Sequence, residues 1–218
     1  MVSEVVARVD GVCGELVLRR AGPHHEIIAN GVFLMDTRNG ESERLMVAAA
    51  ADRMPPGTTM LIGGLGVGFS LREALDHAVI RSAVVVEREP AVIEWNRDVL
   101  GNADLLADPR VRLVRDDLLR WLPTAGRFGA LCLDIDNGPE WTVDEANASL
   151  YGPAGLAMLD AALAPGGVLA VWSAARAPAF AAALAQRFGP VETLAVPVPR
   201  GEPDLVFLVI RSRSGRGN

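Results

Sequence analysis

The stretch MLIGGLGVGFSLRE, residues 60–73, decides the fold. It opens with a short apolar run that predicts a buried strand, and the helix pattern SLREALDHA begins at Ser70. Gly64, Gly66 and Gly68 stand between the two, where a chain that turns tightly from strand to helix favours residues without a Cβ. Such glycines can bring bare backbone groups against a ligand, although the G-x-G-x-G pattern alone is weak support for a nucleotide site.

Strand and helix patterns alternate through the following residues. Strands are expected at 82–89, 110–117, 129–136 and 167–174, and helices at 44–53, 70–78, 90–100, 118–122, 153–164 and 177–189. This order predicts an α/β fold with a doubly wound, mostly parallel, Rossmann-like sheet. The segments 191–199 and 204–212 are expected to add an antiparallel C-terminal hairpin at the sheet edge.

The N-terminal part has a different pattern. Strand-like pieces at 14–20, 25–30 and 31–36 are separated by turn formers, and Asn-Gly at 30–31 is typical of a hairpin. We therefore predict a small N-terminal β-hairpin region at 1–43, a Rossmann-like nucleoside-binding catalytic domain at 44–213, and a tail at 214–218.

Composition excludes several classes of protein. The net charge of −6 provides no basic surplus for nucleic acid, and the two cysteines are too few for a disulfide framework or a metal knuckle. The first ten residues lack the pattern of a signal peptide, and Asp160, Pro165 and two glycines interrupt the longest apolar region. We expect a cytoplasmic protein without metal, membrane or nucleic-acid partners.

Acidic residues follow the expected strands at the edge where such folds bind ligands. Glu87 lies nineteen residues beyond Gly68 (87 − 68) and is predicted to accept hydrogen bonds from both ribose hydroxyls of an adenosine. After the third strand, Asp117 is the preferred partner for an adenine amino group. Asp116 is the second candidate for this contact, and its alternative role is a helix N-cap.

The fourth strand of this series is expected to end in Asp134 and Asp136. Two residues apart on a strand, both side chains would point to one side, into the crevice at the sheet edge. Either could orient or deprotonate a nucleophile, and a turn is the alternative for Asp136. Trp141 and Tyr151 could wall an acceptor pocket, and core packing is the equal alternative for both.

With these motifs in order, the chain resembles the spermidine synthase (polyamine aminopropyltransferase) family of the Rossmann-like, class I S-adenosylmethionine-dependent methyltransferase superfamily. The family's VLIIGGGDGGVLRE resembles residues 60–73, its VEIDxxVIE resembles VEREPAVIE, and its DSSDPxGP resembles DIDNGPEW. DPRVRLVRDDL and LAPGGVLAV also have family counterparts, so the resemblance runs from about Gly31 to Arg211.

The resemblance implies roles residue by residue. Glu87 would hold the ribose, Asp117 the adenine, and the three glycines the nucleoside and its sulfonium arm. Asp134 matches the aspartate that positions and deprotonates the attacking amine. The implied cosubstrate is S-adenosylmethionine or its decarboxylated form, the implied acceptor is a small molecule, and a homodimer is suggested.

The departures concern the amine-binding half of the family's site. Val67 and Asn137 replace two of its aspartates, Ser42-Glu43-Arg44 replaces its Tyr-Gln-Glu, and a late tyrosine is missing from VPVPR. A cationic amine needs carboxylates and aromatic faces around it. Glu43, with Asp136, could partly compensate, and Asn137 would line the substrate pocket.

Three functions remain open from the sequence. Loss of the amine-binding acids makes methyl transfer to a small acceptor our main prediction. Retention of Asp134 and the N-terminal β region favours the first alternative, aminopropyl transfer from decarboxylated S-adenosylmethionine to a polyamine. The second alternative is a nucleoside-binding protein without turnover.

Overall fold

The computed structural model describes residues 3–142, 145–198 and 201–213. The predicted tail at 214–218 lies outside them. The large sheet contains β5 (Thr58–Gly63), β6 (Ile80–Glu87), β7 (Val111–Arg115), β8 (Phe128–Leu133), β9 (Leu163–Ser173), β10 (Glu192–Val196) and β11 (Asp204–Ile210). Its helices are α1 (Glu41–Ala51), α2 (Phe69–Asp76), α3 (Pro90–Asp98), α4 (Ala103–Leu106), α5 (Leu118–Trp121), α6 (Ala148–Tyr151), α7 (Pro153–Ala162) and α8 (Pro178–Phe188), with short 3₁₀ turns at Leu122–Thr124 and Glu145–Asn147.

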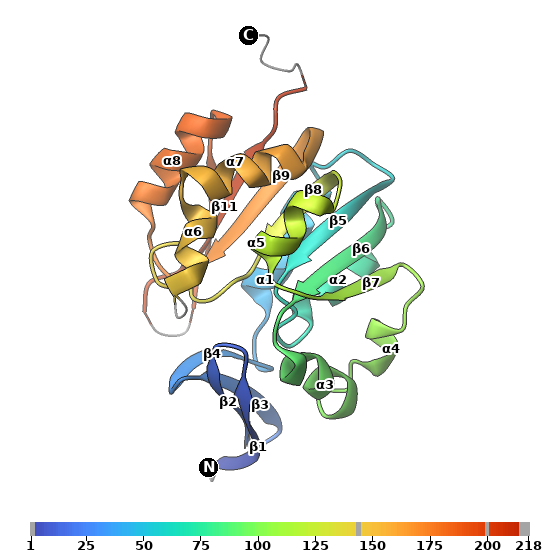
Figure 1. Cartoon of the computed structure of the whole chain (residues 1–218), viewed down its shortest axis with the longest axis vertical. Helices are drawn as coiled ribbons and strands as arrows, with labels where there is room; N and C mark the ends of the chain where they lie inside the picture. The colour runs from blue at the N-terminus through green and yellow to red at the C-terminus, as the bar shows by residue number, and fades with distance from the viewer. Residues whose placement is uncertain (1–2, 143–144, 199–200, 214–218) are drawn as a thin grey trace.

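The seven strands lie in the order β10-β11-β9-β8-β5-β6-β7 (Figure 1). The five from β9 to β7 run parallel, and β11 and β10 are antiparallel at one edge. The order reverses between β5 and β8, and the carboxyl ends beside such a switch point form the usual ligand crevice. The predicted Rossmann-like fold and its C-terminal hairpin are confirmed.

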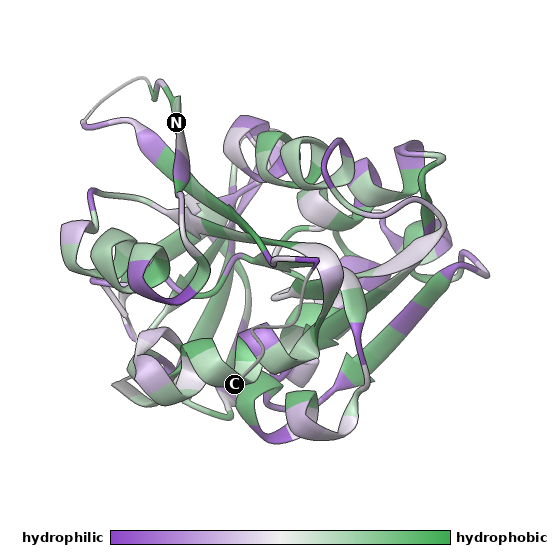
Figure 2. Cartoon of the chain, turned by 90° about the horizontal axis from the view of Figure 1, so that it is seen from above, coloured by the Kyte–Doolittle hydropathy of each residue, from purple (hydrophilic) through white to green (hydrophobic). Residues whose placement is uncertain are grey.

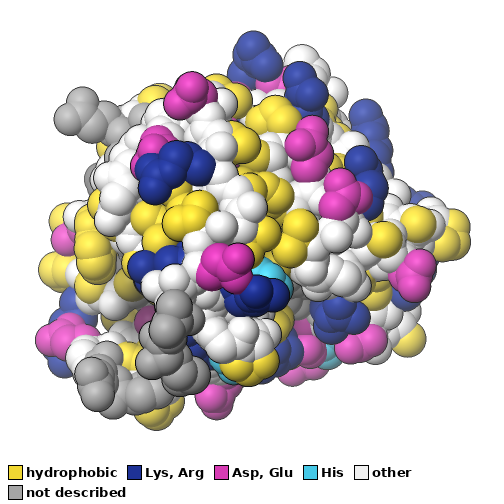
Figure 3. Space-filling view, turned by 90° about the horizontal axis from the view of Figure 1, so that it is seen from below, with side chains coloured by type: hydrophobic (Ala, Val, Ile, Leu, Met, Phe, Trp, Pro, Cys, Tyr) yellow, Lys and Arg dark blue, Asp and Glu magenta, His cyan; other side chains and the backbone are white. Residues whose placement is uncertain are grey.

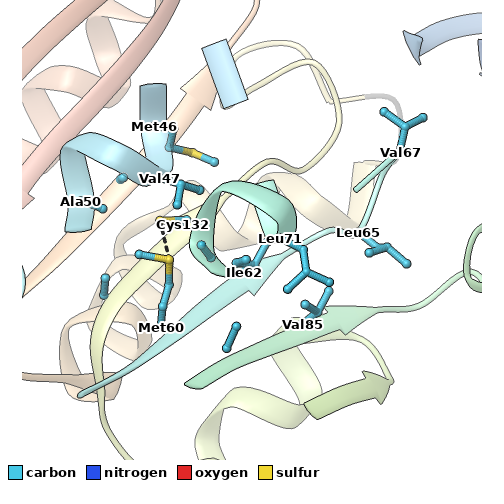
Figure 4. Packing of buried hydrophobic residues seen from close by; sticks show 14 of the residues in the cluster. Met46, Val47, Ala50, Met60, Ile62, Leu65, Val67, Leu71, Val85 and Cys132 are labelled. Atoms are coloured by element: carbon cyan, nitrogen blue, oxygen red, sulfur yellow. Dashed lines mark hydrogen bonds between the residues drawn. The ribbon is translucent and has the colours of Figure 1, made fainter. Parts of the chain in front are cut away.

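Side chains of the parallel strands alternate between two apolar layers, as a buried strand requires. In β5, Met60 and Ile62 pack toward α1 and α2, whereas Leu61 packs on the opposite face, toward α7. Figure 4 shows the first layer, where the Cys132 Sγ lies 3.8 Å from the Met60 Sδ. In Figure 2 the central strands of the large sheet are coloured mostly as hydrophobic.

A separate antiparallel sheet forms the N-terminal part, in the order β1-β2-β3-β4. Its strands are β1 (Ser3–Gly11), β2 (Gly14–Ala21), β3 (His24–Ala29) and β4 (Val32–Asp36). The sheet lies below the large one in Figure 1, and Figure 3 views the molecule from that side, where acidic and basic side chains are interspersed. The sequence analysis identified the last three strands and missed β1, whose side chains are mostly exposed and thus lack a buried apolar run.

Several element boundaries differ from the prediction, and one of these differences affects the site. Helix α1 begins at Glu41 rather than Arg44, and β9 begins at Leu163, within the segment assigned to a helix. Strand β8 ends at Leu133, so Asp134 and Asp136 follow the strand instead of belonging to it. In the described part of the chain, no helix is long and apolar enough to cross a membrane.

Candidate functional site

Two hollows meet at the carboxyl ends of the parallel strands. The first holds about 850 Å³ of empty space including its open mouth, and the second about 1090 Å³. Asp134, Leu34 and Met35 line both. The first hollow is also lined by Gly64, Gly66, Glu87, Arg88, Glu89, Asp116, Asp117, Asp136, Asn147 and apolar side chains. The second is also lined by Asp36, Ser42, Glu43, Asn137, Trp141, Trp172 and Asp204.

Glu87 is the last residue of β6 and lies against the wall of the first hollow. Its Oε2 accepts a hydrogen bond from the Leu65 N–H at 2.9 Å, and its Oε1 accepts one from the Glu89 N–H at 2.8 Å. Burial raises the pKa of Glu87, while these two bonds lower it. Each carboxylate oxygen has a further lone pair, so the fixed side chain can accept two more hydrogen bonds from a ligand.

The glycine loop follows β5. Gly64 has φ +92°, and a Cβ there would lie 2.4 Å from the Asp134 carbonyl oxygen, so a side chain would disrupt the floor of the hollow. A Cβ on Gly66 would lie 2.5 Å from the Met35 sulfur. Gly68 is not among the lining residues and is the N-cap of α2, and its predicted contact with the cofactor stays a prediction. A Cβ at position 68 would lie 2.7 Å from the Asn102 Nδ2, so packing favours glycine there.

Asp116 and Asp117 both line the first hollow, but their capping roles are the reverse of those expected. Asp117 is the N-cap of α5, because its Oδ1 accepts from the Arg120 N–H at 3.0 Å. Asp116 instead pairs with the Arg120 guanidinium, which lowers the pKa of Asp116. The adenine contact of Asp117 stays a prediction.

Asp134 occupies the junction of the two hollows. Burial raises its pKa well above the usual range, and the negative charges of Glu43, Asp204 and Glu87 add to this effect. Asp136 lines the first hollow only, and its φ of +54° breaks the strand alternation that would have placed both side chains together. Its Oδ2 accepts a hydrogen bond from the Asn147 Nδ2 at 2.8 Å.

Glu43 and Asp204 share one hydroxyl in the second hollow. The Ser42 Oγ lies 2.9 Å from the Glu43 Oε2 and 2.9 Å from the Asp204 Oδ2. Since a hydroxyl has a single proton to donate, the two carboxyl groups compete for the hydrogen bond from Ser42. Burial raises the pKa of Glu43 and that of Asp204, while the hydrogen bond from Ser42 lowers each.

The second hollow combines these carboxyl groups with aromatic side chains. In the described part of the chain, no Arg forms an ion pair with Glu43, Asp134 or Asp204. Trp141 lies at its edge with 54% of its surface exposed, and Trp172 lines it as well. Carboxyl groups without cationic partners beside aromatic faces are suited to an organic cation.

Two further predicted residues have different outcomes. Asn137 lines the second hollow and is 5% exposed. Tyr151 lies in the core, where its ring packs edge-on against Phe180 and its hydroxyl donates to the Ile135 carbonyl at 3.2 Å. Burial raises the pKa of Tyr151. Tyr151 thus has the packing role that the sequence left as the alternative.

The sequence analysis missed Asp204, Ser42 and Trp172 in the second hollow and Arg88 and Glu89 in the first. A signal for Asp204 was present, because the last strand was expected to be antiparallel. The first residue of an antiparallel strand lies at the edge where its parallel neighbours end. Leu205 pairs with Ser173, which places Asp204 beside the end of β9.

The chain is similar in sequence to proteins named polyamine aminopropyltransferase. It is 35% identical over 166 residues to the protein of Mycobacterium tuberculosis strain H37Rv. The aligned region covers 72% of this chain and 30% of the relative. It is 32% identical over 136 residues to polyamine aminopropyltransferase 2 of Pseudomonas aeruginosa, with 59% and 37% covered. The chain thus spans roughly a third of the length of these relatives. No family model matches it.

Solved structures of spermidine synthases have a similar fold. The enzyme from Thermotoga maritima gives a TM-score of 0.77 at 16% identity, covering 96% of this chain and 73% of that one. A spermidine synthase in complex with the transition state analogue AdoDATO gives a TM-score of 0.79 at 16% identity, covering 96% of this chain and 74% of that one. This likeness supports the architecture of both sheets.

Proposed function

We propose that this spermidine synthase-like chain transfers an aminopropyl group from decarboxylated S-adenosylmethionine to a polyamine acceptor. The comparisons favour this alternative over methyl transfer, our main prediction from the sequence. The observation that carries the proposal is the position of Asp134, a carboxyl group between a hollow suited to a nucleoside and a hollow suited to a cationic amine.

The first hollow fits the nucleoside of the donor. Glu87 is held by two backbone N–H groups with lone pairs left for the ribose hydroxyls. The bare backbone of Gly64 and Gly66 lines the same space, and Leu34 and Met35 supply an apolar wall. Such a combination of apolar lining and a few fixed polar groups is typical of small-molecule sites.

The second hollow fits the acceptor. Glu43 and Asp204, which both contact the Ser42 hydroxyl, would hold an ammonium group remote from the reaction, and its charge would lower their pKa values. The indole faces of Trp141 and Trp172 would contact the methylene chain and its charge. These residues would supply the amine recognition that the family supplies with other side chains.

Asp134 would then act at the boundary. The nitrogen of the acceptor attacks the carbon next to the sulfonium sulfur, the carbon–sulfur bond breaks, and methylthioadenosine leaves. The attacking amine must first lose a proton, and the Asp134 carboxylate is placed to accept it. Two cationic substrates on either side would lower the pKa of Asp134 and ionise it for this step.

Mass spectrometry of the reaction products tests the proposed function. The chain is incubated with decarboxylated S-adenosylmethionine and putrescine, and with S-adenosylmethionine and putrescine in parallel. We expect an aminopropylated amine and methylthioadenosine from the first mixture. A methylated amine from the second mixture, without product in the first, would instead support methyl transfer.

The Asp204→Asn variant should weaken acceptor binding selectively. Loss of one ammonium–carboxylate contact is expected to raise the KM for the amine about tenfold, because such charged hydrogen bonds contribute about 1.5–3 kcal/mol. Donor affinity should change by less than about twofold. Steady-state kinetics with each substrate varied in turn measures both, and Asp98→Asn, at an exposed position on α3, is the matched control.

The same variant should alter the pH dependence of stability. A carboxyl group whose pKa is raised in the folded chain stabilises it fully below the unfolded pKa, about 4, and this contribution is lost as pH rises through the raised value. The wild-type chain should therefore lose stability over this interval relative to Asp204→Asn. Thermal melts at a series of pH values would measure the difference, and parallel curves would refute it.

A further inference from the structure

We infer that Glu89 is a positioning residue that holds the N-terminal sheet against the first hollow and thereby sets the affinity for the donor. The inference rests on the proposed function of that hollow. Glu89 lines the hollow, is 8% exposed, and follows Glu87 by two residues.

The carboxylate of Glu89 binds the turn between β1 and β2. Its Oε2 accepts from the Val12 N–H at 2.8 Å, and its Oε1 accepts from the Cys13 N–H at 3.2 Å. Glu89 is also the N-cap residue of α3, yet its side chain makes no capping bond to that helix. Its carboxylate is therefore committed to a contact with a segment 76 and 77 residues earlier in the chain.

The turn is shaped around this carboxylate. A Cβ on Gly11 would lie 2.6 Å from the Glu89 Oε2, so a larger residue would push the two apart. On its other side, the Cys13 carbonyl accepts from the Asn30 Nδ2 at 2.9 Å. Val12 is 63% exposed, and it contacts the Glu89 carboxylate through its backbone N–H.

The contact connects the two parts of the first hollow. Leu16, Ile27, Leu34 and Met35 form its wall on the N-terminal sheet, whereas Glu87 belongs to the large sheet. The backbone N–H of Glu89 donates to the Glu87 Oε1 at 2.8 Å. One residue thus orients the predicted ribose acceptor through its main chain and fixes the opposite wall through its side chain.

The test uses the full chain, with methylthioadenosine as the calorimetric probe. Glu89→Gln keeps the shape of the side chain, but its amide nitrogen cannot accept the N–H of Val12 or Cys13. We expect about a tenfold loss of affinity and a similar rise in the KM for the donor. The value of kcat should stay within about twofold. Glu94→Gln, at an exposed position on α3, is the matched control.

A second variant changes the turn that Glu89 binds. Gly11→Ala should weaken probe binding as well, and the double variant should lose little more than Glu89→Gln, because both changes break one contact. Hydrogen exchange at the Val12 and Cys13 amides should accelerate in Glu89→Gln. In the wild-type chain, the probe should slow it.

Unchanged probe affinity in Glu89→Gln, with faster exchange at the turn, would show that the contact is merely structural and would overturn the inference. A fall in kcat with an unchanged KM for the donor would also overturn it. If the wild-type chain fails to bind methylthioadenosine, the proposed function itself is contradicted.

Discussion

Replacing Asp134 with asparagine should lower turnover by a factor of about 10²–10⁴, the usual contribution of a positioned general base. The side chain lies at the junction of both hollows, so its loss removes the proton acceptor next to the attacking nitrogen. Because its pKa is raised well above the ordinary value, the carboxyl group is readily neutral without substrates. Asparagine is close to that neutral form in shape and charge, and the variant should therefore fold.

Single-turnover measurements and calorimetry separate the two effects in Asp134→Asn. Donor affinity should remain within about twofold while the chemical step slows. Asp136→Asn is the informative comparison, since Asp136 lines the first hollow alone and is hydrogen-bonded to Asn147. We expect the larger loss at Asp134. Equal rates in wild type and Asp134→Asn would discard the proposed base.

Replacing Glu87 with glutamine should weaken donor binding by about 1–3 kcal/mol, or about 5- to 150-fold. The amide keeps one acceptor oxygen but places an N–H₂ group where the other oxygen accepts a backbone N–H. The ribose would lose one acceptor, and a buried backbone donor would lose its partner. Methylthioadenosine calorimetry measures the change, with Glu94→Gln as the control. Retained affinity would remove Glu87 from the site.

The first hollow could be predicted from local sequence. Glu87 ends one strand and Gly64 follows another, both with clear apolar runs, and the ends of neighbouring parallel strands must meet at one edge. The role of Gly68 could not be told from sequence, because a glycine that packs against Asn102 has the same sequence pattern as one that faces a ligand. A glycine in the motif indicates the backbone conformation. It does not indicate whether a ligand or another side chain lies beside that glycine.

The second hollow could not be predicted in the same way. Ser42 and Asp204 are 162 residues apart in the sequence and meet only because β11 starts beside α1. The raised pKa values of Glu43 and Asp204 arise from burial in the fold. Comparison with family motifs alone suggested that the acids were lost, whereas the fold supplies carboxyl groups from other positions. The same reasoning applies to Glu89, whose partners are backbone groups and have no sequence signature.

Calorimetry with the two donors tests the central claim most directly. S-adenosylmethionine and its decarboxylated form differ by one carboxylate, and Asp134 lines the hollow proposed for the donor. We predict tighter binding of the decarboxylated donor, because a carboxylate on the arm next to Asp134 would be repelled by the ionised form of that side chain. Tighter binding of the carboxylated donor would contradict aminopropyl transfer and restore methyl transfer.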